Sequence, residues 1–171
     1  MGIPVMLEST VVKRSKKIII GAAGIVLIGL VVVGFVIYKT NDAFSGDHPR
    51  YETVLPSGKT IGELNGWQRV SPPESDPVYA YLDTIEGISI SVSEQPLPES
   101  FKAATADKVA ELAKQYSATT TLEAGETKIY IGTSAKGPQS VIFTKKGLLI
   151  LIKSQEKVSD KAWTTYVQSL T

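Results

Sequence analysis

An uninterrupted apolar run over residues 18–38, IIIGAAGIVLIGLVVVGFVIY, constrains this chain more than any other feature. The run has 21 residues and no charge, and 14 of them are Ile, Leu, Val or Phe. As a helix rising ~1.5 Å per residue it is about 31 Å long, which matches the ~30 Å hydrocarbon core of a bilayer. A helix is the one single segment that satisfies its own backbone hydrogen bonds in lipid. The sequence therefore predicts a transmembrane helix over residues 18–38.

The charges on either side of this span predict its orientation. Four basic residues lie just before it: Lys13, Arg14, Lys16 and Lys17. Basic residues collect on the cytoplasmic side, so we expect a cytoplasmic tail over residues 1–17, a tether over 39–50 and an extracytoplasmic domain over 51–171. A cleaved signal peptide is the alternative, but its apolar region is ~7–15 residues long, and no A-x-A site follows the span. An uncleaved, single-pass anchor is therefore the expectation.

The composition of the remaining chain excludes several function classes. Residues 39–171 hold 14 of the 18 Lys and Arg and 16 of the 17 Asp and Glu, a net charge of −2. A nucleic-acid partner calls for a basic patch, so we expect none. The chain has no Cys and one His, His48, which lies in the tether. Disulfides, thiolate metal sites and Cys nucleophiles are excluded, and no metal or cofactor site is expected.

Hydrophobic periodicity in residues 51–171 predicts one α+β domain, an antiparallel sheet packed with two helices. Ile88, Ile90 and Val92 alternate with serines, as in a half-buried strand with a hydroxyl-covered outer face. Residues 148–152, LLILI, are apolar throughout and predict a central strand covered on both faces. Gln95 to Pro98 is expected to end the sheet before a helix over 99–116, and Ser159 to cap a second helix. The expected strands are residues 52–55, 67–70, 78–82, 88–93, 119–122, 128–132, 139–144 and 148–153. Turns are expected at residues 56–58, 83–87 and 145–147, and the last two join neighbouring strands into hairpins.

Two short motifs suggest enzymatic chemistry but lack their context. Gly58-Lys59-Thr60 ends like a phosphate-binding loop, yet Thr53 stands where that motif needs its first glycine. Ser154 and Lys157 have the S-x-x-K spacing of serine acylases, but the companion S-D-N and K-T-G motifs are missing. We interpret the first as a turn and the second as a surface loop. No catalytic residue is predicted.

Two polar surfaces are the candidates for binding a partner. One is the serine face of the strand, formed by Ser89, Ser91 and Ser93. The other is the polar connection over residues 133–140, dense in hydroxyls and flexible residues, which could hold an anion or a peptide carboxylate or could be a solvated turn. Its candidate contacts are Thr133, Ser134, Lys136 and Gln139. The aromatic residues Trp67, Tyr79, Tyr81, Trp163 and Tyr166 are expected in the core.

Several phrases from residue 55 onward carry a family resemblance: GW at 66–67, VSPP at 70–73, QPLPESF at 95–101, and the stretch from 131 to 143. They resemble a group of uncharacterised single-pass membrane proteins of candidate-phylum bacteria with small genomes. That resemblance implies a topology and an origin, with no activity and no catalytic residues. The order of elements is also similar to that of PsbP-like α+β sandwiches.

The sequence combines a membrane anchor, a single folded domain and no intact catalytic motif. Together these features predict a non-enzymatic module that binds or scaffolds a protein or peptide of the cell envelope. One alternative is a structural subunit of a pilus-like or other envelope assembly. However, the tether is non-helical, and the processing pattern of type IV pilins is absent. A cryptic envelope hydrolase is the second alternative. Neither the partner nor the oligomeric state follows from the sequence.

Overall fold

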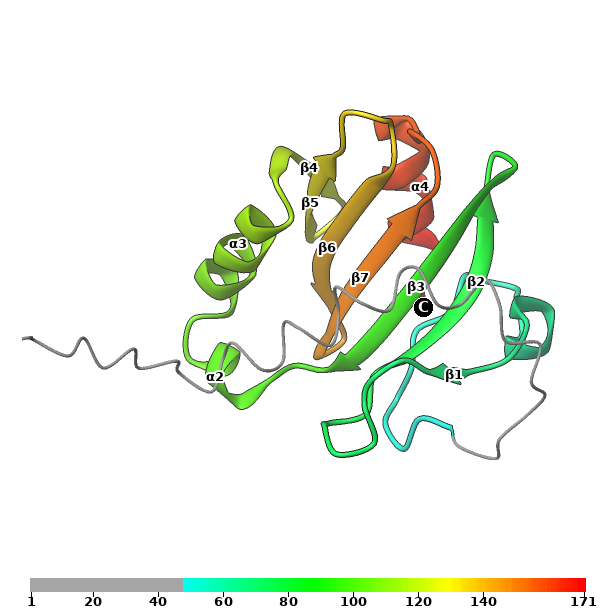
Figure 1. Cartoon of the computed structure of the whole chain (residues 1–171), viewed down its shortest axis with the longest axis vertical. Coiled ribbons are helices and arrows are strands. Elements are labelled where there is room, and N and C mark those ends of the chain that lie inside the picture. The colour runs from blue at the N-terminus through cyan, green and yellow to red at the C-terminus, as the bar shows by residue number, and fades with distance from the viewer. Residues whose placement is uncertain (1–47) are drawn as a thin grey trace, which may run out of the picture.

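The computed structural model describes residues 48–171, so the predicted transmembrane helix, the tail and most of the tether lie outside the described residues. Residues 48–171 form an antiparallel sheet with helices on both faces (Figure 1), which confirms the predicted α+β class. Within this part of the chain, no helix is both long and apolar enough to cross a membrane. The elements are η2 (Ile61–Leu64), β1 (Gln68–Arg69), β2 (Tyr79–Ile85), β3 (Ile88–Pro96), α2 (Glu99–Lys102), α3 (Thr105–Gln115), β4 (Ala118–Ala124), β5 (Thr127–Thr133), β6 (Gln139–Lys145), β7 (Leu148–Ser154) and α4 (Asp160–Ser169).

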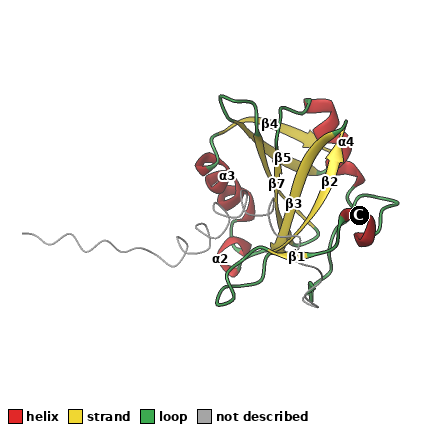
Figure 2. Cartoon of the chain, turned by 45° about the vertical axis from the view of Figure 1, so that its right-hand side comes forward, coloured by secondary structure: helices red, strands yellow, loops and turns green. Residues whose placement is uncertain are grey.

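The seven strands are ordered β1-β2-β3-β7-β6-β5-β4, so β7 lies in the middle of the sheet (Figure 2). All five residues of the LLILI run in β7 are buried. The prediction of a central strand covered on both faces is confirmed. The sheet is made of two blocks, β1-β2-β3 and β4-β5-β6-β7, that meet where β3 pairs with β7.

Alternation along the strands divides the buried residues between two cores. One face of the sheet, here called the α4 face, packs under α4 and the segment over residues 51–64. The opposite face, here called the α3 face, packs under α3. The α4 core is the larger one, with Trp163 at its centre and fully buried. The α3 core is built from Val109, Leu112, Ala113, Ile142, Leu149 and Leu151.

Two tight turns set the registers of the two main hairpins. Glu86 and Gly87 join β2 to β3, and Lys146 and Gly147 join β6 to β7, all four with positive φ. Two successive residues with positive φ are typical of the type I′ turn, whose twist matches that of paired strands. Both hairpins were predicted, but the strands reach closer to the first turn than expected. The predicted loop over residues 83–87 is only two residues long.

The strand predicted over residues 52–55 is wrong. Residues 52–55 form no strand of the sheet. Next to them Pro56 forms an isolated bridge with Leu170 near the end of the chain, and Leu55 and Thr171 exchange backbone hydrogen bonds of 3.2 and 2.9 Å. Val54 donates its backbone N–H to the side chain of Glu94 over 3.2 Å. The segment is therefore held by the side chain of Glu94 and by backbone hydrogen bonds to the last residues of the chain, rather than by pairing with a strand of the sheet. The turn predicted at residues 56–58 is confirmed by the 3.0 Å bond from Lys59 N to Pro56 O.

Two further boundaries differ from the prediction. β3 continues through Gln95 and Pro96, because both residues pair with the start of β7. The helix predicted over residues 99–116 is broken into α2 and α3 at Ala104, whose φ and ψ of −150° and 57° are not helical. Nothing in the sequence marks this break, since Ala103 and Ala104 are both good helix formers. The C-terminal helix does begin at Ser159, whose hydroxyl accepts from Ala162 N, as predicted.

Candidate functional site

The α3 face carries the serine surface predicted from the sequence. Helix α3 packs over β4, β5 and β6. At the other end of this face Ser89 is exposed, while Ser91 and Ser93 are partly buried. Ser93 is already engaged, because its hydroxyl donates to Leu151 O over 2.9 Å. Ser89 and Ser91 therefore form the accessible part of the predicted serine face.

Strand pairing adds a lysine and a further serine to this surface. Lys153 of β7 lies directly opposite Ser91 of β3 on one side and Ser140 of β6 on the other. Directly opposed residues have Cβ atoms ~4.5–5.5 Å apart, so the lysine side chain leaves the sheet between two hydroxyl-bearing neighbours. We call these three residues the hydroxyl row. Burial lowers the pKa of Lys153 below its usual range.

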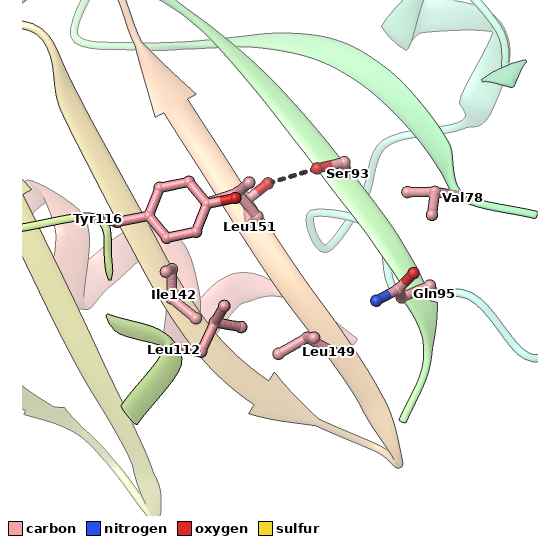
Figure 3. A pocket seen from close by; sticks show the side chains of 8 residues that line it. All are labelled: Val78, Ser93, Gln95, Leu112, Tyr116, Ile142, Leu149 and Leu151. Atoms are coloured by element: carbon pink, nitrogen blue, oxygen red, sulfur yellow. Dashed lines mark hydrogen bonds between the residues drawn. The ribbon is translucent and has the colours of Figure 1, made fainter. Parts of the chain in front are cut away.

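A small recess lies beside the hydroxyl row, under the C-terminal end of α3 (Figure 3). Its cavity volume is only about 10 Å³, which is room for about one water. Typical small-molecule sites, at roughly 300–1,000 Å³, are far larger. Its walls combine three leucines with three polar side chains: Leu112, Leu149, Leu151, Ser93, Gln95 and Tyr116.

Two polar atoms in this recess have no hydrogen-bond partner among residues 48–171. Gln95 is 5% exposed, and its Nε2 makes no hydrogen bond. The hydroxyl of Tyr116 is buried and also without a partner, and burial raises the pKa of Tyr116. Figure 3 shows the Tyr116 ring reaching from the end of α3 over β7. An unsatisfied buried polar group costs about 1–3 kcal/mol, so two in one recess single it out as a site that gains from a polar ligand or a water.

The predicted loop over residues 133–140 is a closed turn. Ser134 N donates to Pro138 O over 2.9 Å, and Gly137 N donates to Ser134 O over 3.0 Å. Thr133, Ser134 and Lys136 are exposed. Thr133 ends β5 at the same end of the sheet as Ser89, three strand spacings or roughly 14 Å away. The two predicted surfaces thus share an end of the sheet but do not form one site.

Gln139 is the predicted site residue that the structure removes from the surface. It is 4% exposed, at the start of β6. Its side-chain oxygen accepts from Val158 N over 2.8 Å and from the Trp163 indole over 2.9 Å. Its side-chain nitrogen donates to Thr133 Oγ1 over 3.1 Å. Gln139 therefore joins β5, β6 and α4, and its amide is occupied inside the domain.

The two enzyme-like motifs have structural roles. Lys59 forms a salt bridge with the buried carboxylate of Asp83, which also accepts from the hydroxyl of Tyr166 over 3.1 Å. Ser154 is buried in β7, where its hydroxyl accepts from Gln139 N and donates to Glu156 O. Lys59 thus fastens the N-terminal segment to the sheet, and Ser154 fastens the end of β7. Ser154 is the last residue of β7, and the remainder of the motif, residues 155–157, is an exposed loop as predicted.

Sequence reasoning missed Glu94, which is fully buried on the α4 face. Its Oε2 accepts from Val54 N, and its Oε1 has no hydrogen-bond partner in the described part of the chain. Burial raises the pKa of Glu94 to about 7. The alternation of buried and exposed residues along β3 could have predicted this burial, because position 94 follows Ile88, Ile90 and Val92 on the buried face. Its neighbour Gln95 follows the serines in the same way.

No group of three or more His, Cys, Asp or Glu lies together in residues 48–171 as a metal site would require. Comparison with protein-family models, with curated proteins and with solved structures finds no match. The family resemblance noted above stays a prediction. Function must therefore be argued from the geometry of the domain itself.

Proposed function

We propose that this chain is a membrane-anchored binding module that docks a peptide or protein of the cell envelope on its α3 face. The span over residues 18–38 holds the module at the bilayer, and residues 51–171 face outward. The module acts by binding and has no catalytic centre. The hydroxyl row beside an unsatisfied recess is the observation that carries this proposal.

The polarity of this surface supports binding over a purely structural role. Buried polar atoms without hydrogen-bond partners are rare in folded proteins. Here Gln95 Nε2 and the Tyr116 hydroxyl lie beside an accessible row of hydroxyls and one ammonium group. A partner that brings hydrogen-bond acceptors would satisfy them.

Photo-crosslinking in native membranes tests this proposal. A photoreactive amino acid is placed at position 91, in the hydroxyl row. The control carries it at Glu123, which is exposed on β4 at the opposite edge of the sheet. We expect one recurrent heterologous partner from position 91 and none from position 123, identified by mass spectrometry.

Three results would contradict the proposal, and each would favour a different interpretation. Equal crosslinking from both positions would mean that the α3 face is not selective. Long ladders of the chain with itself would favour the filament subunit. Turnover of an envelope substrate by the purified chain would overturn the non-enzymatic role.

A further inference from the structure

Residues 51–54, here called the latch, cover the buried side chain of Glu94 without pairing with any strand of the sheet. Tyr51 donates its hydroxyl to the backbone oxygen of Glu94 over 2.7 Å, and Val54 donates its N–H to the Glu94 side chain over 3.2 Å. Tyr81 of β2 donates its hydroxyl to Val54 O over 3.4 Å. Two of these three bonds therefore end on Glu94.

The chain that follows the latch is fastened independently of Glu94. Leu55 and Thr171 exchange backbone hydrogen bonds of 3.2 and 2.9 Å, and Ser57 N donates to Ser169 O over 2.7 Å. None of these bonds involves the buried carboxyl. The latch can therefore lift about Leu55 while the rest of the segment stays attached.

Neutral side chains surround the Glu94 carboxyl. Tyr79 of β2 lies directly opposite Glu94 on one side, and Ile150 of β7 on the other. Burial raises the pKa of Tyr51 and of Tyr81, and the nearby carboxyl adds to both increases. These two hydroxyls therefore stay protonated and bring no charge to Glu94.

The charged groups around the latch are paired among themselves. Glu52 of the latch is exposed and lies 3.7 Å from Lys146 in the β6–β7 turn. Asp83 forms its salt bridge with Lys59 and accepts from Tyr166 of α4. A negative charge on the buried carboxyl would thus be stabilised, within the described part of the chain, by the single hydrogen bond from the latch. Such a charge is costly unless water or a cation reaches it.

We propose that the latch is a proton-controlled switch, closed over Glu94 while the carboxyl is protonated and lifted when the carboxyl loses its proton and must be hydrated. The latch is the part of the cover that lifts because no strand ladder holds it. In a chain anchored as proposed above, lifting adds four residues, roughly 13–14 Å of extended chain, between the bilayer and the sheet. That added reach rests on the proposed anchor, whereas the switch itself does not.

The direction of the pH effect follows from proton linkage. Burial raises the pKa of Glu94 from 4.5 to about 7 in the closed state, and hydration returns it toward the usual value once the latch lifts. The closed latch therefore keeps a proton between pH 4.5 and about 7 that the lifted latch has lost, so lifting becomes easier as the pH rises. Between pH 5 and pH 8 the equilibrium constant for lifting should increase roughly 70-fold.

Hydrogen exchange of the full chain in lipid nanodiscs, followed by NMR and corrected for the intrinsic pH dependence of exchange, measures this equilibrium. The Val54 amide reports lifting of the latch, and the Ile150 amide in the central strand reports unfolding of the domain. We expect Val54 to be less protected than Ile150, with a protection factor that falls roughly 70-fold between pH 5 and pH 8. Low, non-denaturing urea should speed exchange at Ile150 and leave Val54 unchanged, because lifting exposes little surface.

Two variants test the role of the buried carboxyl. Glu94→Gln should give the same Val54 protection factor at pH 5 and pH 8, within about threefold. The matched control Glu52→Gln removes an exposed carboxyl from the latch itself and should keep the pH dependence of the wild type. A pH dependence in Glu94→Gln equal to that of the wild type would overturn the proposal.

The wild type alone gives a second test that needs no variant. Equal protection of Val54 and Ile150, with the same response to urea, would show that the latch opens only when the whole domain unfolds, and it would overturn the switch. Peptide docking on the α3 face is decided separately by crosslinking from position 91.

Discussion

Replacing Glu94 by glutamine should make the domain more stable at neutral and alkaline pH. Glu94 is fully buried, with one carboxylate oxygen bonded to Val54 N and the other without a partner. Its burial raises the pKa from the usual 4.5 to about 7, with the Val54 hydrogen bond acting in the opposite direction. Glutamine has the same shape and no charge, so it can keep the bond from Val54 and avoids burying a negative charge.

The sign and size of the effect follow from proton linkage. Between pH 4.5 and about 7 the folded state holds a proton on Glu94 that the unfolded state has lost, so stability falls as the pH rises. The contribution is fully present below pH 4.5 and is lost above pH 7. At roughly 1.4 kcal/mol per pH unit, the loss is about 3 kcal/mol. We expect Glu94→Gln to be more stable than the wild type by an amount that grows by about 3 kcal/mol between pH 4.5 and pH 8.

Urea unfolding of a fragment over residues 51–171, followed by tryptophan fluorescence at several pH values, measures this difference. The control is Glu123→Gln, an exposed residue of β4, which should change the unfolding free energy by less than about 0.5 kcal/mol at every pH. Parallel stability curves for wild type and Glu94→Gln from pH 4.5 to 8 would refute the reasoning. They would show that Glu94 titrates in the folded domain as it does in the unfolded chain.

Four further predictions follow from the packing and from the anchor. Gly132→Ala should destabilise the domain by about 1–3 kcal/mol in urea unfolding, because the new Cβ would lie 2.1 Å from Tyr116 O. A Cβ at Gly62 would meet only Thr60 Oγ1 at 4.0 Å, an ordinary contact, so Gly62→Ala should cost nothing measurable. Trp163→Ala should cost about 3–5 kcal/mol, against under about 0.5 for the exposed Thr165→Ala on the same helix. The fragment used above should be soluble and unfold cooperatively in calorimetry, since its core lies within it. Protease added to intact cells should degrade the domain, and full protection before lysis would contradict the orientation.

Short sequence patterns predicted most of the helices and strands, because hydrophobic alternation and turn-forming residues act between neighbours in the chain. The alternation of Ile88, Ile90 and Val92 with serines placed β3 and its faces. The glycine of Lys146-Gly147 predicted the β6–β7 turn, and counting outward from it pairs Ser140 with Lys153. Each of these signals lies within about fifteen residues of the chain.

The site itself depends on contacts between distant segments. The hydroxyl row needs β3 beside β7, and no turn joins these strands, so no sequence rule pairs Ser91 with Lys153. Tyr116 lines the recess beside Leu149 and Leu151 of β7 only because α3 packs back against the sheet. Glu94 is buried because the segment near Val54 covers it, 40 residues away in the chain. These pairings are fixed by tertiary packing, which single-sequence patterns do not encode.

Reactivity of Lys153 in native membranes tests docking on the α3 face most directly. A membrane-impermeant acylating reagent is added to intact cells and, separately, to the purified chain in nanodiscs, and mass spectrometry gives the acylation of Lys153 relative to Lys136. Burial lowers the pKa of Lys153, so a larger fraction of its amine is uncharged and reactive. A partner on the hydroxyl row should protect Lys153 in cells, with Lys136 equally modified in both preparations. The same Lys153 to Lys136 ratio in cells and in nanodiscs would contradict the account.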